Sequence, residues 1–396
     1  MINSLLASKE KCTGCGLCAT VCPTKSIKIV QDREGFYYPE IENSCINCGK
    51  CSRACPILNE PVIENRITQK VCMAIHKDKK IWEKSTSGGA FTAICNLFGD
   101  SETIVFGAKF DANNKGVCHT FVEGVENIDA FRGSKYSQSL IGDSFVFAKE
   151  FLEKGRKVIF SGTPCQISAL RNYLGGKSYK NLLCIDLICH GVGSPKVLKE
   201  YLEECEINEK AILDYEFRHK IIKLGRHSLY NSKFIYKDGG QKIAKNDLYN
   251  NLFLQKIICR KSCDSCEYAN LQRQGDLTVG DAKQAYSINL KVPSDRNGSV
   301  IICNTENGVK VFERLSECMD IYSCTIDDVV KANHPLSHCT PSSKKREEFF
   351  ASLSEGTNVI TCMNKYFKKS SVSSKISKLM PDKFKARIKK IIKKEE

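Results

Sequence analysis

The sequence predicts a multidomain α+β fold in which a small cysteine-rich module precedes a larger mixed α/β domain. Eight cysteines within the first 58 residues fall into two runs of identical spacing. From about residue 71 onward, short apolar runs of strand length alternate with helical patterns, which is typical of mixed α/β domains. We therefore divide the chain into the module at 1–58, a polar linker at 59–70, a main domain at 71–340 and a basic tail at 341–396.

The two cysteine runs of the module are typical of a bacterial ferredoxin with two [4Fe–4S] clusters. They are Cys12, Cys15, Cys18 and Cys22 before Pro23, and, 33 residues later, Cys45, Cys48, Cys51 and Cys55 before Pro56. In this pattern the fourth cysteine of each run ligates the other cluster. The first predicted cluster therefore has Cys12, Cys15, Cys18 and Cys55 as ligands, and the second has Cys45, Cys48, Cys51 and Cys22. Zinc knuckles usually have a longer spacer between their halves. The 23 cysteines and the absence of a secretory signal in residues 1–11 indicate a reducing compartment, which disfavours disulfides.

The main domain is predicted from hairpins and one parallel unit. The runs 104–110 and 117–123 flank a turn-rich segment and predict a hairpin, as do 229–236 and 241–244. A strand at 157–160, a helix at 165–174 and a strand at 182–189 predict a βαβ unit with parallel pairing. A strand at 300–303 is followed by a predicted helix over 309–318, and after about residue 340 the core pattern fades.

Charge and hydropathy exclude several functional classes. The 42% hydrophobic content is ample for a core, and no apolar run approaches the length of a membrane span. Three clusters with thiolate ligands would lower the formal charge of +15 to roughly +9. The segment 365–396 alone has 12 Lys or Arg against 3 Asp or Glu. The remaining body is therefore near neutral, which argues against a nucleic-acid groove, and we expect a cytoplasmic protein.

A third set of metal-ligand candidates lies in the main domain. Cys259, Cys263 and Cys266 have the spacing C-x₃-C-x₂-C, which suits three irons of another [4Fe–4S] cube. Cys189, at the end of a predicted strand, is the preferred fourth ligand, and Cys184 and Cys165 compete with it. Radical-SAM enzymes use the same spacing, but only 130 residues follow Cys266, too few for their usual barrel. A structural zinc or three unmetallated thiols is the open alternative.

Three short loops of the main domain have the chemistry of phosphate sites. Residues 85–91 and 161–166 place small and hydroxyl residues before helical patterns, where backbone N–H groups attract anions. Residues 131–136 combine two cations, a hydroxyl and an aromatic ring. Each loop alone is more often an ordinary helix cap or turn.

Taken in order, these motifs, with Cys189-His190-Gly191 and the segment 275–281, resemble the beta subunit family of coenzyme F-420 hydrogenase and dehydrogenase over about residues 1–340. The resemblance implies a mixed α/β flavoprotein domain that binds FAD and exchanges hydride with a deazaflavin or a related reductant. It implies a cluster on Cys189, Cys259, Cys263 and Cys266. The implied flavin contacts are Ser87, Gly88, Gly89, Arg132, Ser134, Lys135, Tyr136, Ser161, Gly162, Thr163, Pro164 and Gln166.

A flavin beside iron–sulfur clusters predicts an oxidoreductase that converts between hydride and single-electron transfer. Two residues are candidate catalytic groups: His190 as a proton relay, and Cys165 as a reactive thiol at a helix start. The alternatives are a hydrogen-bonding partner for His190 and a packing role for Cys165. The expected partners are a redox partner protein or ferredoxin and a small-molecule or deazaflavin substrate. The alternative function is a non-catalytic electron-transfer subunit of a larger redox complex.

The C-terminal tail has a basic amphipathic pattern. Apolar residues recur at helical spacing among lysines, at Ile376, Leu379, Met380, Phe384, Ile388 and Ile391. Such a helix is typical of membrane-surface binding, although a solvated tail explains the pattern equally well. Lipid binding would place the protein at the inner face of the membrane and suggest a role in surface polysaccharide metabolism.

Overall fold

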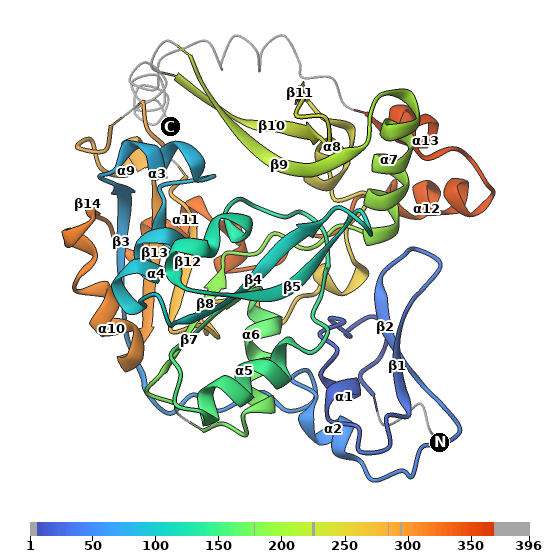
Figure 1. The fold of residues 1–396 in the computed structure, drawn as a ribbon, viewed down its shortest axis with the longest axis horizontal. Helices are drawn as coiled ribbons and strands as arrows, with labels where there is room; N and C mark the ends of the chain where they lie inside the picture. The colour runs from blue at the N-terminus through green and yellow to red at the C-terminus, as the bar shows by residue number, and fades with distance from the viewer. Residues whose placement is uncertain (1–5, 178, 224–225, 284, 294, 368–396) are drawn as a thin grey trace, which may run out of the picture.

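A mixed nine-stranded sheet forms the centre of the computed structural model, which describes residues 6–177, 179–223, 226–283, 285–293 and 295–367 (Figure 1). In spatial order its strands are β14 (Met319–Ser323), β3 (Arg66–His76), β13 (Ser299–Thr305), β12 (Leu277–Asp281), β8 (Leu182–Leu187), β7 (Val158–Gly162), β4 (Ile104–Asp111), β5 (Gly116–Glu123) and β6 (Ser139–Leu140). The strands β12, β8, β7 and β4 are mutually parallel neighbours. This confirms the predicted βαβ unit, whose helix is α6 (Pro164–Tyr173). The predicted β4–β5 hairpin is also confirmed, with Ile104 opposite Glu123.

Helices cover both faces of this sheet. One face packs against α4 (Ala90–Phe98), α10 (Glu306–Phe312) and a 3₁₀ helix at Val125–Phe131. The other face packs against α6 and α5 (Ser144–Glu153) around buried Phe106 and Phe160. Further short helices are α3 (Lys79–Lys84), α9 (Ala285–Ile288), α11 (Ile326–Ala332) and the 3₁₀ turns Lys261–Cys263, Leu315–Glu317 and His334–Leu336. The helix predicted over 309–318 begins earlier, because Thr305 caps it through the Gly308 amide, and it ends at Phe312, before a separate 3₁₀ turn at Leu315–Glu317.

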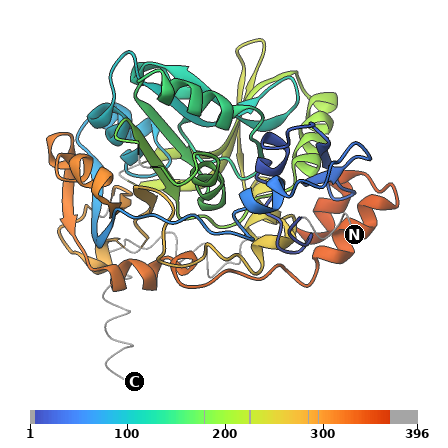
Figure 2. The ribbon, with the colours of Figure 1, turned by 90° about the horizontal axis from the view of Figure 1, so that it is seen from below.

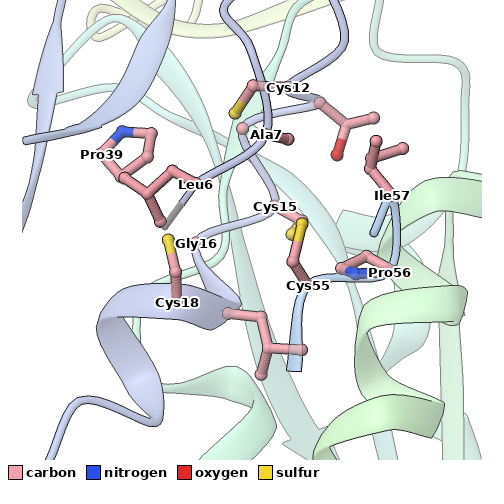
Figure 3. A pocket seen from close by; sticks show the side chains of 13 residues that line it. Leu6, Ala7, Cys12, Cys15, Gly16, Cys18, Pro39, Cys55, Pro56 and Ile57 are labelled. Carbon is pink, nitrogen blue, oxygen red and sulfur yellow. The ribbon is translucent and has the colours of Figure 1, made fainter. Parts of the chain in front are cut away.

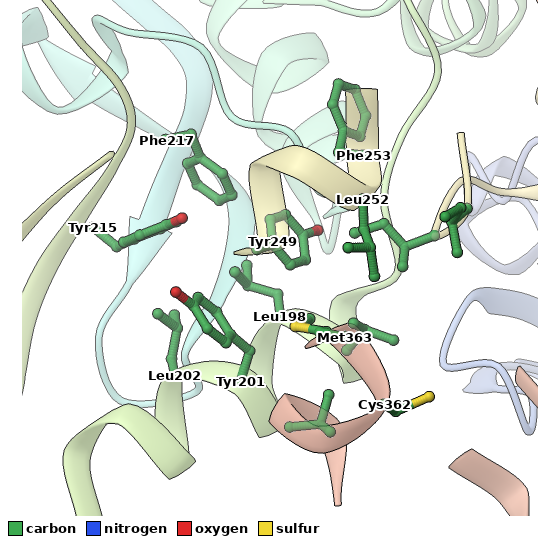
Figure 4. Close-up of a cluster of buried hydrophobic side chains, with 14 of the residues drawn as sticks. Leu198, Tyr201, Leu202, Tyr215, Phe217, Tyr249, Leu252, Phe253, Cys362 and Met363 are labelled. Carbon is green, nitrogen blue, oxygen red and sulfur yellow. The ribbon is translucent and has the colours of Figure 1, made fainter. Parts of the chain in front are cut away.

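A second sheet and four helices form a separate part of the core (Figure 4). Its strands are β11 (Gln241–Lys245), β10 (Arg226–Tyr236) and β9 (Ile212–Lys223), which confirm the predicted β10–β11 hairpin. Its helices are α7 (Pro195–Asn208), α8 (Leu248–Leu254), α12 (Arg346–Ser354) and α13 (Val359–Tyr366). The last two helices lie beyond the predicted end of the core at residue 340, yet Phe349 and Met363 are fully buried in it. The apolar core therefore extends to Tyr366.

The N-terminal module is a small unit that docks on the main domain (Figure 2). It contains α1 (Leu17–Thr20), the hairpin β1 (Ile27–Gln31) and β2 (Tyr37–Ile41), and α2 (Lys50–Ala54). Both short helices contact α6, and Leu17 is completely buried in the core around α5 and α6. These contacts pack the module against the main domain. Strand β3 begins at Arg66, inside the predicted linker, so the linker is shorter than expected.

No helix in the described part of the chain combines the length and apolarity needed to cross a membrane. The amphipathic pattern at 376–391 lies outside the described residues.

Candidate functional site

The first cysteine set surrounds one pocket in the docked module (Figure 3). Cys12, Cys15, Cys18 and Cys55 all line it, together with apolar neighbours such as Leu6, Leu17, Pro39 and Ile57. Gly14 has a φ of +69°, and a Cβ there would lie 2.5 Å from the carbonyl oxygen of Tyr37. A side chain at this position would therefore push the cysteine loop away from β2. The pocket thus joins the three closely spaced cysteines of the first run to the fourth cysteine of the second.

The chemistry of this pocket suits an anionic metal cluster. Burial raises the pKa of Cys15 to about 12 and also raises that of Cys18, and the neighbouring thiolate charges raise both further. The four thiols of this set are half-buried, and they become ligands only when a metal cluster displaces their protons. The guanidinium of Arg260 lies beside them, is 1% exposed and has no salt bridge to a carboxylate among the described residues. A buried cation needs a counter-charge, and a thiolate-ligated cluster would provide it.

The second cysteine set lies at the outer end of the module. Cys48 is exposed, whereas Cys51 is buried and its pKa is raised by burial and by the charges of Cys45 and Cys48. Gly49, with a φ of +68°, begins α2 between these ligands. The sulfur of Cys22 lies 3.6 Å from Thr24 Oγ1. Thr24 and Ser44 both hydrogen-bond Ser26, at 2.7 and 2.8 Å, and so tie the segment after Cys22 to the residue before Cys45.

The third cysteine set is brought together from β8 and the loop after α8. Burial raises the pKa of Cys263 well above its usual value, and the charges of Cys189, Cys266 and Cys259 raise it further, in that order. Gly191 has a φ of +92°, and a Cβ there would lie 3.4 Å from Cys263 Cβ and 3.9 Å from Cys259 Sγ. All four predicted ligands therefore lie within one another's electrostatic reach, and Gly191 leaves the space beside them open.

The competing ligands occupy different surroundings. Cys184 is buried in β8, where burial raises its pKa to about 12 and its charged neighbours are Arg171 and Asp276. Cys165 lies beside the third set and is considered below. Cys339, which the sequence did not indicate as a ligand, also lies near this set. Its charge raises the pKa of Cys266, and the Cys339 sulfur lies 2.7 Å from the carbonyl oxygen of Asp264. Across the described residues, no three Cys, His, Asp or Glu side chains converge as they would on a single metal ion.

Two of the three predicted flavin loops meet at the start of α4. The amide of Ser134 donates to Thr86 Oγ1 at 3.1 Å, and Arg132 Nε donates to Thr92 Oγ1 at 3.0 Å. Gly89 begins α4 with a φ of 92° and no side-chain cap. The segment containing Ser87, Gly88 and Gly89 therefore lies against the segment containing Arg132 and Ser134, with helix amides available to an anion.

Unsatisfied buried atoms at this place fit a bound cofactor. His76 Nδ1 accepts from the amide of Asp78 at 3.0 Å, so Nε2 carries the proton of the neutral ring, yet it has no partner among the described residues. A Cβ on Gly89 would lie 2.9 Å from His76 Cβ, so the ring is adjacent to the loop. Asn297 Oδ1 is also buried without a partner, while its amide donates to Thr86 O at 2.8 Å. Buried polar atoms normally have partners, and a flavin with its phosphates offers both donors and acceptors.

The third predicted loop is largely satisfied by the protein itself. Ser161 Oγ donates to Phe106 O at 2.9 Å, and the Gln166 side chain accepts from the Thr163 amide at 3.0 Å as a capping box before Pro164. His119 binds the carbonyl of Ser161, at 3.1 Å. Gly162 lies close to the Gln166 side chain, since a Cβ on Gly162 would be 3.1 Å from Gln166 Oε1. This loop therefore has a complete structural explanation as the start of α6.

Lys135 and Tyr136 are neighbours in the sequence but contact different parts of the protein. The Lys135 ammonium donates to Arg132 O at 2.7 Å, and burial lowers its pKa to about 8. The Tyr136 ring stacks on Phe253 with centroids 4.5 Å apart, and its carbonyl accepts from the Gly193 amide at 3.2 Å. The segment from Cys189 to Gly193 therefore touches both the third cysteine set and Tyr136.

A group of buried and half-buried cations around His190 was not predicted from the sequence. Lys283 Nζ lies 3.2 Å from His190 Nε2, and Lys256 donates to the His190 carbonyl. Burial lowers the pKa of His190 to about 4, as do the charges of Lys283 and Lys256. The ring is therefore neutral at physiological pH and accepts a hydrogen bond at Nε2.

The same group continues toward the α4 loop. Arg218 pairs with Asp281 at 2.7 Å and also bonds the Tyr136 hydroxyl. Lys220 donates to Ser87 O at 3.0 Å, and burial lowers its pKa to about 7, helped by the nearby charge of Arg218. We call Arg218, Lys220, Lys256 and Lys283 the cationic group. Arg218 and Lys220 lie on strand β9, but Lys256 and Lys283 are distant from them in the sequence and no motif links the four, so only the fold reveals the group.

Two sequence families match this chain. The C terminus of the coenzyme F420 hydrogenase/dehydrogenase beta subunit matches residues 155–329, and a 4Fe-4S dicluster domain matches residues 11–59. No curated protein matches it. A chain in the structure titled "Xenon derivatization of the F420-reducing [NiFe] hydrogenase complex from Methanosarcina barkeri" is similar with 17% identity and a TM-score of 0.43, over 75% of this chain and 91% of that one.

Proposed function

Because this chain belongs to the coenzyme F420 hydrogenase/dehydrogenase beta subunit family and carries a 4Fe-4S dicluster domain, we propose that it is an iron–sulfur flavoprotein oxidoreductase. The family supports a redox role in electron transfer. The finer proposal is that a flavin, FAD in this family's pattern, exchanges hydride with a deazaflavin or another small molecule and passes electrons to three [4Fe–4S] clusters. A redox partner protein or ferredoxin would be the other reactant.

One observation carries the proposal: the segment from Cys189 to Gly193 joins the third cysteine set to the cationic group and to Tyr136. Cys189 belongs to the third set, His190 contacts Lys283, and the Gly193 amide donates to Tyr136 O. A flavin bound there would supply two-electron chemistry, and the clusters one-electron chemistry. A single short segment would then hold the two cofactors side by side.

The protein's own residues would bind and orient the flavin. The cationic group and the first turn of α4 offer positive charge for its phosphates. His76 Nε2 and Asn297 Oδ1 offer a donor and an acceptor. His190, as a neutral ring whose Nε2 faces Lys283, is placed to accept a hydrogen bond rather than to donate a proton. Cys165 is half-buried, and desolvation raises the pKa of its thiol, which disfavours the reactive thiolate and supports a packing role.

The test is anaerobic purification with iron, sulfide and flavin quantified per chain. We expect about twelve irons and one flavin, as three four-iron clusters and one cofactor require. Cys259→Ser should remove about four irons, whereas Lys283→Met should lower flavin content and leave the iron unchanged. About eight irons without flavin would refute the proposal.

Activity separates the enzyme from its alternative. Hydride donors, a reduced deazaflavin among them, should bleach the flavin of the isolated chain. Full cofactor content with reduction only by a partner protein would instead support a non-catalytic electron-transfer subunit. Membrane-surface binding by the tail and a role in surface polysaccharide metabolism rest on the sequence pattern alone, and liposome co-sedimentation of the full chain against a chain ending at Tyr366 tests the first.

A further inference from the structure

We propose that electrons pass between the third and second cluster sites through the first, which lies between them. Arg260 and Tyr268 connect the first site to the third, and the second site is the solvent-facing end of the route. This inference rests on the proposed function in one respect, that the third cysteine set carries a cluster. It adds the order of the sites and the residues that connect them.

Arg260 makes the first connection. It follows Cys259 of the third set, and its Nε and Nη2 atoms donate to the carbonyl of Cys12 at 3.0 and 2.9 Å. Its Nη1 donates to Tyr37 O at 3.0 Å, and its guanidinium lies 3.9 Å from the Tyr38 ring centroid. One ligand of the third set is thus joined to one ligand of the first through a single residue and a pair of hydrogen bonds.

Tyr268 makes the second connection. It lies two residues after Cys266, and its hydroxyl is 3.4 Å from the carbonyl oxygen of Pro56, which follows Cys55. The hydroxyl is held in place by Ser168 Oγ at 3.1 Å, from α6. A buried aromatic ring therefore extends from the third set to the fourth ligand of the first.

Cys165 lies in the space between these two connections. Burial raises the pKa of its thiol, and the nearby charges of Cys266, Cys189 and Cys15 raise it further. Its neighbours therefore include ligands of both the third and the first sets. It is a small, half-buried residue at the start of α6, where a bulky side chain would take up space between the two sites.

The second site has the opposite character. Cys48 is exposed, and Ile46 between Cys45 and Cys48 is 62% exposed. Arg53 donates to Cys48 O at 3.0 Å, from within the module. The second site therefore faces solvent, where an external one-electron carrier can approach. The route runs from the third site to the first, then to the second, or in reverse.

With clusters bound, each transfer between sites would move one electron from a donor site to an acceptor site, with no bond made or broken. The two electrons of one hydride would need two such transfers, and the remaining proton would leave the flavin for solvent. Arg260 is a positioning residue whose positive charge favours the reduced, more negative state of the first cluster, because hydrogen bonds and charge near a cluster set its potential.

The first experiment is a redox titration of the anaerobic holoprotein, followed by EPR, comparing wild type with Arg260→Gln. We expect the midpoint potential of one cluster to fall and the iron content to stay unchanged. Cys55→Ser, which alters a ligand of the first cluster, should change the signal of that same cluster. Three unshifted potentials in an Arg260→Gln protein with full iron content would overturn the inference.

The second experiment follows the kinetics and the magnetic coupling. After rapid mixing with a hydride donor, Tyr268→Leu should delay reduction of the module's clusters several-fold, while Tyr322→Leu, on the edge strand β14, should not.

In wild type, the EPR signal of the third cluster should be split by its neighbour, and the splitting should change in Cys55→Ser but persist in Cys48→Ser. The reverse pattern would make the second cluster the inner one and overturn the proposal even if Arg260→Gln fails to fold.

The proposed function and the proposed electron route fail on different outcomes. A holoprotein without the third cluster refutes both the proposed function and this inference. A holoprotein with three clusters and a flavin that accepts hydride, but with wild-type potentials, kinetics and coupling in these variants, refutes the inference alone.

Discussion

The ion pair between Arg346 and Glu34 should hold the N-terminal module against helix α12, and its removal should give a measurable local opening. Arg346 donates to Glu34 Oε1 at 3.0 Å and to the carbonyl of Cys259 at 2.8 Å, and it also contacts Glu34 Oε2. The side chains are 5% and 17% exposed. Removing one partner of a buried pair costs about 3–5 kcal/mol, and the residual exposure of Glu34 favours the lower end. We therefore expect Arg346→Met to lower the free energy of local opening by about 3 kcal/mol.

The assay is native-state hydrogen exchange at the amide of Phe36, which donates to Asp32 in the β1–β2 turn beside Glu34. A loss of about 3 kcal/mol corresponds to exchange roughly a hundredfold faster. The control is Lys365→Met on α13, which removes an ion pair with Glu348 whose side chains are both more than half exposed; exposed pairs contribute little. Glu34→Gln added to Arg346→Met should recover part of the loss, because the unpaired carboxylate is then gone. Exchange in Arg346→Met no faster than in the control would refute the reasoning.

Two further predictions concern the flavin loops. A Cβ on Gly88 would lie 2.3 Å from Ala74 O and 2.4 Å from the Ser299 amide, so Gly88→Ala should cost about 1–3 kcal/mol or more and reduce flavin content; Gly116→Ala, whose nearest contact is 3.7 Å away, is the control in thermal melts. Because burial lowers the pKa of Lys220 to about 7, flavin binding should weaken as pH rises through that value and the ammonium is lost. The flavin-free fold should meanwhile gain stability from about pH 7 toward the usual lysine value of 10.5, since the unfolded chain binds more protons there. Flavin dissociation constants across this range test the point, and a wild-type profile as flat as that of Lys220→Met would contradict it.

Much of the fold follows from local patterns. The cysteine runs, the β4–β5 and β10–β11 hairpins and the β7–α6–β8 unit each lie within a few dozen consecutive residues. Cysteine spacing predicts the first, and apolar runs with their turns and helical patterns predict the others. The cysteines of the predicted third set, Cys189 with the 259–266 cysteines, lie near one another, as expected for a loop at the end of a strand; that they bind a cluster stays a prediction.

The rest depends on contacts between distant residues. Helix α12 looks like polar tail in the sequence, because its buried face combines Phe349 and Phe350 with Arg346. Burial of that arginine depends on Glu34, 312 residues earlier. Arg260 and Tyr268 likewise look like ordinary residues beside cysteines until the docked module provides their partners. A single sequence has no pattern that reports such pairs.

Both candidate sites hold buried positive charge for which the protein alone supplies few carboxylates. Arg260 has no carboxylate partner among the described residues, and the carboxylates whose charges act on Arg218 and Lys220, the buried members of the cationic group, include Asp281 and Glu83. Such cations are costly to bury unless they are paired. Iron–sulfur clusters and flavin phosphates are both anionic, and both would lie where these cations are buried. The cofactors would therefore stabilise the fold as well as carry the chemistry, because metal binding and folding are coupled. Docking of the module through Arg260 would then depend on a filled first cluster, since only the cluster's charge balances the guanidinium that joins it to the third site.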